Sequence, residues 1–180
     1  MTNPIDKISV LIADPHRAFA EALADRLNRE PGLSVAGVAT AGADVIPLVE
    51  QTRPDVVLSE LEFGNEGAFV VARNLVRAAP GSRIVLLTGV LSDIFIEQSA
   101  SAGVGYVLKT EPLAEVIAAI QTAAAGGTPR SPAVAERLTY DRARGRHVLK
   151  APDRLTRLTT RQIEVLRLIA GGRSVREVAR

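Results

Sequence analysis

Two kinds of hydrophobic pattern alternate along about the first 125 residues of the chain. Short, nearly continuous apolar runs are typical of strands that are buried on both faces of a sheet. Between them, apolar residues recur every three or four positions, which predicts amphipathic helices. We expect strands at residues 8–13, 33–39, 56–58, 84–87 and 104–108, and helices built on the apolar positions within 19–27, 45–49, 69–76, 94–100 and 113–120. Five such pairs predict an α/β fold: a doubly wound, parallel, five-stranded sheet with helices on both faces and right-handed crossovers.

Proline and glycine residues separate these elements. Pro47 falls inside the second helical pattern. We expect it near the first turn of that helix, where a missing N–H costs least. Gly64 and Gly67 predict a loop after the third strand.

The pattern changes after residue 126. Prolines and arginines interrupt residues 127–153, which we interpret as a linker with one short helix at 132–138. Helical spacing returns from residue 158, with capping boxes at 159–162 and 174–177. Two helices joined by a glycine-containing turn form the front of a helix-turn-helix. We therefore expect three parts, at residues 1–126, 127–153 and 154–180.

Charge divides the chain at a similar place. Residues 1–128 carry 9 Lys and Arg against 15 Asp and Glu, whereas residues 129–180 carry 13 against 5. A split from net −6 to net +8 suggests an acidic module joined to a basic segment that binds nucleic acid. The alternative interpretation is that both are ordinary solvated surfaces.

Composition excludes several classes of protein. The absence of Cys rules out disulfide scaffolds and thiolate metal sites, and an aromatic content of 3% argues against base-stacking platforms. The first residues do not show the pattern of a signal peptide, a basic stretch followed by an apolar one, and no apolar run reaches about 18 residues. We expect a soluble, cytoplasmic protein without a membrane partner.

Polar residues follow four of the expected strands. Asp14, Glu60, Thr88 and Lys109 each stand where a strand ends. In open parallel sheets ligands bind outside the carboxyl ends of the strands, so these side chains are candidates for one site. Any one of them alone would more often be a cap or a turn residue.

The chain resembles a known family in both parts. Residues 7–125 resemble the receiver domain of two-component response regulators, a CheY-like fold. Residues 158–180 resemble the start of the LuxR/NarL-type helix-turn-helix, whose usual wording is Leu-Thr-x-Arg-Glu-x-Glu-Val-Leu-x-Leu, and residues 127–135 resemble that family's linker helix. The resemblance implies a DNA-binding transcriptional regulator that is not an enzyme.

The resemblance also assigns roles to the strand-end residues. Family receivers take phosphate from a histidine kinase onto an Asp, and two further acids hold Mg²⁺. Thr88 fits the switch hydroxyl, Tyr106 the aromatic switch residue and Lys109 the pocket lysine of the family. Asp14 fits the first of the two acids.

Two positions depart from the family pattern. Pro15 replaces the second acid and offers no metal ligand, while Glu60 takes the place of the phosphate-accepting Asp. The extra methylene of Glu moves the carboxylate by about one bond length, and ~1 Å of misplacement can cost about 100-fold in a positioned reaction. We therefore expect no cofactor, no metal ion and no ordinary phosphorelay with a histidine kinase.

Three interpretations of this pocket remain open. Glu60 could pair with Lys109 and hold one conformation without phosphate, leaving control to dimerisation, a partner or a small ligand. The pocket could instead have lost all function, or could retain slow phosphorylation. A flavodoxin-like enzyme is disfavoured, because no glycine-rich phosphate loop follows the first strand.

The output segment leaves further alternatives. Its recognition helix would follow residue 180, so we expect a truncated domain that touches DNA phosphates only. The candidate phosphate contacts, equally well interpreted as solvated positions, are Arg157, Arg161, Arg173 and Arg176. We expect a homodimer or a heterodimer with a related regulator, and a chain that ends naturally at residue 180 would favour sequestering such a partner over binding DNA.

Overall fold

A parallel sheet forms the centre of the computed structural model, which describes residues 7–63, 70–143 and 145–150. Its strands are β1 (Ile8–Ala13), β2 (Leu33–Ala39), β3 (Val56–Ser59), β4 (Arg83–Thr88) and β5 (Gly105–Leu108). They lie side by side in the order β2-β1-β3-β4-β5, and every neighbouring pair is parallel. The doubly wound α/β fold that the hydrophobic pattern predicted is confirmed.

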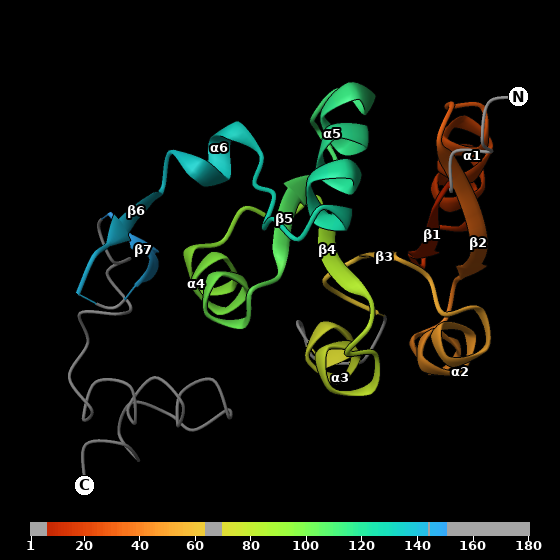
Figure 1. Cartoon of the computed structure of the whole chain (residues 1–180), viewed down its shortest axis with the longest axis horizontal. Coiled ribbons are helices and arrows are strands. Elements are labelled where there is room, and N and C mark those ends of the chain that lie inside the picture. Colours follow the sequence, from red (N-terminus) through yellow and green to blue (C-terminus); the bar gives the residue numbers. More distant parts are fainter. Residues whose placement is uncertain (1–6, 64–69, 144, 151–180) are drawn as a thin grey trace, which may run out of the picture.

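Helices cover both faces of this sheet (Figure 1). The alternation of side chains along a strand explains why: in β1, Val10 and Ile12 enter one apolar cluster, whereas Leu11 and Ala13 enter the other. The first cluster also holds apolar residues of α1 (Arg17–Asn28) and α5 (Leu113–Ala124). The second holds those of α2 (Gly42–Thr52), α3 (Val70–Ala78) and α4 (Asp93–Ala102).

The expected place of Pro47 is wrong. Helix α2 begins at Gly42, so Pro47 is its sixth residue and lies in the second turn. The sequence Gly42-Ala43-Asp44 adds a turn before the apolar positions, with Asp44 placed favourably near the positive end of the helix. The helix therefore gives up the one N–H bond that residue 47 would make to the carbonyl of Ala43.

A β-hairpin lies within the stretch that we interpreted as linker. Helix α6 (Pro132–Ala135) is shorter than expected, and β6 (Leu138–Asp141) pairs antiparallel with β7 (Arg146–Leu149). Opposed apolar residues stabilise the pair, because both Leu138 and Leu149 pack against the second core cluster. Gly145, at φ +63°, supplies the left-handed backbone in the connection.

Residues 154–180, where the helix-turn-helix is expected, lie outside the described residues, so the domain boundaries stay predictions. Within the described residues, none of the helices combines the length and apolar character needed to cross a membrane.

Candidate functional site

The strand-end residues come together at the carboxyl edge of the sheet. Asp14, Glu60 and Lys109 directly follow β1, β3 and β5, and Thr88 is the last residue of β4. Ladder hydrogen bonds continue past the strand ends and fix their positions. The Glu60 amide donates to the Ala13 carbonyl at 2.7 Å, and the Lys109 amide donates to the Thr88 carbonyl at 2.8 Å.

One ammonium group bridges two carboxylates in this site. Lys109 Nζ lies 2.5 Å from Asp14 Oδ2 and 2.5 Å from Glu60 Oε2. The three side chains are 16%, 3% and 8% exposed, in that order, so water screens these pairs little. Nζ also lies 4.7 Å from the centroid of the Phe19 ring, whose face attracts a cation. The ion pair between Glu60 and Lys109, which was one of the three interpretations of the pocket, is present, and Asp14 shares it.

The two remaining carboxylate oxygens also have partners. Glu60 Oε1 accepts a hydrogen bond from the Leu61 amide at 2.6 Å. Asp14 Oδ1 accepts one from the His16 amide at 2.8 Å and lies 3.0 Å from His16 Nδ1. All four oxygens are thus satisfied in the protein, as buried carboxylates require. A lone lysine against two carboxylates leaves the cluster with a net charge of −1 when the exposed His16 is neutral.

Thr88 and Tyr106 are tied to the same loop residue. The Val90 amide donates to Thr88 Oγ1 at 3.2 Å, and the Tyr106 hydroxyl donates to the Val90 carbonyl at 2.7 Å. Burial, together with the negative charge of Glu60, raises the pKa of Tyr106 to about 12, although a hydrogen bond from the Ser92 backbone opposes this. Tyr106 is fully buried and stays neutral at physiological pH.

An open cavity of about 510 Å³ lies above these residues. Its lining comes from the loops that follow β1, β3 and β4 and from the lysine after β5: Pro15, His16, Glu60, Glu62, Thr88, Gly89, Val90 and Lys109. The volume is sufficient for a small ligand.

The donors at this edge match Mg²⁺ poorly. Asp14, His16 and Glu60 each place one ligand atom within 4.8 Å of the others. Mg²⁺ prefers oxygen ligands in octahedral geometry, whereas imidazole suits Zn, Cu, Fe or Ni. Pro15 contributes no ligand, and both carboxylates already hold the ammonium group of Lys109.

Sequence reasoning missed three contributors to this site. His16 holds Asp14, Phe19 lies under the lysine, and Val90 connects Thr88 with Tyr106. A polar residue two positions after a strand-end Asp was a usable signal for His16, because Asp side chains bind backbone amides two residues on. Phe19 carried no signal beyond its helical spacing. The four candidate phosphate-binding arginines, Arg157, Arg161, Arg173 and Arg176, lie outside the described residues.

Comparisons with known proteins agree with the fold. The sequence model described as the response regulator receiver domain matches residues 10–121. The transcriptional regulatory protein DesR of Bacillus subtilis is 31% identical over 173 residues, which cover 96% of this chain and 79% of DesR. The uncharacterized transcriptional regulatory protein YxjL of the same species is 30% identical over 175 residues, covering 97% of this chain and 80% of YxjL. A LuxR-family two-component response regulator from Aurantimonas has a crystal structure with a TM-score of 0.67 and 27% identity, covering 72% of this chain and 94% of that one.

Proposed function

The chain belongs to the response regulators that carry a receiver domain, and on that premise we propose a transcriptional regulator whose receiver is held in one state by its own lysine. The names of DesR and YxjL describe regulators of transcription and no enzyme. These relatives support DNA as the final target of this chain. The arginines at 157, 161, 173 and 176 remain the candidate phosphate contacts.

The bridge from Lys109 to Asp14 and Glu60 carries this proposal. It puts a fixed positive charge between the two carboxylates, where a receiver of the family's usual pattern would place a divalent ion. An incoming ion would have to displace the ammonium group and leave it without partners in a nearly buried place. Removing one member of a buried ion pair typically costs about 3–5 kcal/mol. We therefore propose that the pocket takes up no Mg²⁺.

The state of Glu60 also disfavours phosphate transfer. A carboxylate nucleophile needs a free oxygen aimed at phosphorus, but Glu60 Oε1 is bound to the Leu61 amide and Oε2 to Lys109. Phosphoryl transfer depends almost entirely on positioning and charge stabilisation. The longer side chain of Glu and the absence of a second acid at Pro15 weaken both.

The activity of the regulator is then controlled by events other than phosphorylation. The cavity above Lys109 is open and lined by groups of both charges, so a small polar ligand is one candidate signal. A second is pairing with another copy or with a related regulator. The alternative function, sequestering such a regulator, uses the same locked receiver and differs only in the role of the output segment.

A phosphodonor assay tests the locked pocket. We expect that incubation of the full chain with acetyl phosphate and Mg²⁺ leaves its intact mass unchanged. The comparison variant carries Pro15→Asp with Glu60→Asp, which returns both acids of the family pattern to the pocket. A stoichiometric gain of one phosphate on Glu60 of the unmodified chain would overturn the proposal, whatever the variant does.

A further inference from the structure

The segment after α5 covers the outer edge of the sheet. We call residues 127–150 the strap. The Tyr106 amide donates to the Pro129 carbonyl at 2.9 Å, and the Ser131 amide donates to the Tyr106 carbonyl at 3.1 Å. These two bonds pair the strap with β5 in parallel. An exposed edge strand is a template for pairing with other chains, and the strap removes that template here.

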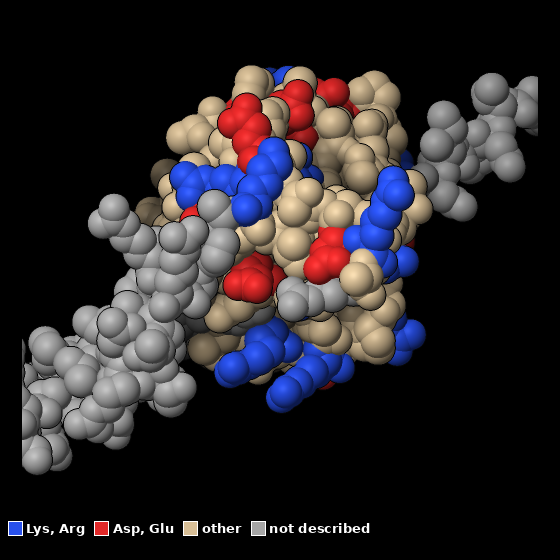
Figure 2. All heavy atoms as spheres, turned by 90° about the vertical axis from the view of Figure 1, so that its left-hand side faces the viewer, with Lys and Arg blue, Asp and Glu red and all other residues tan. Residues whose placement is uncertain are grey.

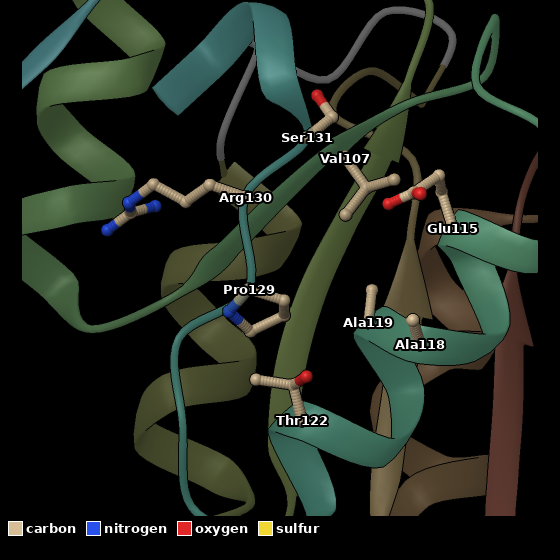
Figure 3. A pocket seen from close by; sticks show the side chains of 8 residues that line it. All are labelled: Val107, Glu115, Ala118, Ala119, Thr122, Pro129, Arg130 and Ser131. Atoms are coloured by element: carbon tan, nitrogen blue, oxygen red, sulfur yellow. The ribbon is translucent and has the colours of Figure 1, made fainter. Parts of the chain in front are cut away.

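The sequence of β5 fits the strap closely. A Cβ added to Gly105 would lie 2.9 Å from Pro129 Cγ and 3.1 Å from Val85 Cγ2, so only glycine allows this approach. Figure 3 shows Pro129 pointing toward α5 and Arg130 pointing away from it. A cavity of about 240 Å³ remains between α5 and the strap. The close approach of Pro129 to Gly105 indicates a built seat for this part of the strap.

The far part of the strap is fixed to α4. Arg137 Nη1 lies 2.5 Å from Asp93 Oδ1 at the start of α4, and Arg146 donates to the Ser101 hydroxyl near its end. The Lys150 amide donates to the Arg137 carbonyl, which holds the end of the hairpin against its beginning. Figure 2 shows acidic and basic side chains next to one another on this side of the molecule. Polar side-chain contacts therefore attach the hairpin to α4 at two separate places.

Tyr106 connects the strap with the candidate site. Its backbone is bonded to Pro129 and Ser131, while its hydroxyl is bonded to Val90, the residue that also holds Thr88. One buried residue thus has the strap on one side and the loop above the site on the other. If the strap moves, the bond between Tyr106 and Val90 is strained or broken, and if the Val90 loop moves, the bonds between Tyr106 and the strap are strained or broken.

We propose that the strap is an internal occupant of the α4–β5 surface, which keeps that surface from other proteins and holds Tyr106 inward. The binding partner of this surface is the chain's own residues 127–150. Release of the hairpin from α4 frees the edge of β5 and the Tyr106 backbone together.

Residue-resolved amide hydrogen exchange of the full chain tests this proposal. The test variant carries Arg137→Glu with Arg146→Glu, which places acidic groups opposite Asp93 and Ser101. The control variant carries Arg142→Glu with Lys150→Glu, an equal charge change at exposed positions of the same strap. The Tyr106 amide depends on Pro129, whereas the nearby Lys109 amide depends on Thr88. We expect exchange at Tyr106 to accelerate about tenfold or more in the test variant, with Lys109 unchanged and the control variant like the unmodified chain.

A charge swap completes the test. Adding Asp93→Arg to Arg137→Glu should restore slow exchange at Tyr106. Unchanged exchange at Tyr106 in the test variant would overturn the proposal, as would equal acceleration at Lys109, because the strap would then add only general stability. If the test variant does not fold, exchange at the Tyr106 and Lys109 amides is compared in the same way with Arg137→Gln alone. The exchange comparison uses protein without phosphodonor, whereas the phosphodonor assay uses the unmodified chain and reads its mass, so this proposal and the proposed function fail separately.

Discussion

At the scale of residues, the candidate site is a balance of buried charges. Asp14 and Glu60 would repel each other at this separation without the ammonium group of Lys109 between them. The lysine gains from both carboxylates and from the Phe19 ring, which offsets the cost of taking it out of water. The stability of the pocket thus depends on one side chain.

Replacing Lys109 should therefore be costly. We expect Lys109→Met to lower the free energy of unfolding by roughly 3 kcal/mol at pH 7, because two carboxylates lose their common partner. Lys109→Arg keeps the charge and should cost less. Urea unfolding of the three proteins measures the differences, and a loss below about 0.5 kcal/mol for Lys109→Met would mean that the bridge contributes little.

Tyr106 should give the protein a specific weakness at high pH. The pKa of Tyr106 is raised from 10.0 to about 12 in the folded chain. The neutral hydroxyl therefore makes its full contribution to the free energy of unfolding below pH 10, and this contribution is lost as the pH rises through 12. Tyr106→Phe loses the bond to Val90, at a cost of about 1 kcal/mol near neutral pH. The variant has no hydroxyl to titrate, so we expect this deficit to shrink by about 1 kcal/mol by pH 11. Unfolding curves of both proteins at pH 8 and pH 11 check this, and a constant deficit would contradict it.

At the scale of elements, the hairpin shows how tertiary contacts override a linker-like composition. Two of its arginines have partners on α4, because Arg137 pairs with Asp93 and Arg146 with Ser101. Its apolar residues Leu138 and Leu149 are too few to form a core alone, but they reach the apolar cluster of the sheet. A two-stranded hairpin is marginally stable by itself, so the folding of this hairpin depends on its contacts with the apolar cluster and with α4.

The close approach of Pro129 to β5 predicts that Gly105 does not tolerate a larger residue. We expect Gly105→Ala to destabilise the fold by about 1–3 kcal/mol, because the new methyl group meets Pro129 and Val85 at 2.9–3.1 Å. Gly81→Ala is the matched control, since a Cβ at Gly81 meets nothing within 4 Å. Urea unfolding measures both changes, and equal effects at the two glycines would argue against tight packing of the strap.

At the scale of the whole molecule, the strap restricts how two copies of the chain could pair. Surfaces near α4 and β5 are taken by residues 127–150, whereas α1 and the outer side of α5 lie on the other face of the sheet (Figure 1). Dimerisation remains a prediction, and so does a cytoplasmic location. If the chain does pair through its receiver, the strap favours the side of α1 and α5.

The hydrophobic pattern alone determined the architecture and the edge of the sheet where the candidate site lies. Buried parallel strands have short apolar runs, and their carboxyl ends must meet at one edge, so Asp14, Glu60, Thr88 and Lys109 were recognisable from their positions. Only the tertiary structure decided how these groups pair, because a bridge of 2.5 Å depends on side-chain conformations that no spacing encodes. It likewise decided the place of Pro47 and the order of the hairpin. The hairpin depends on contacts between residues far apart in the chain, and a local pattern carries no record of them.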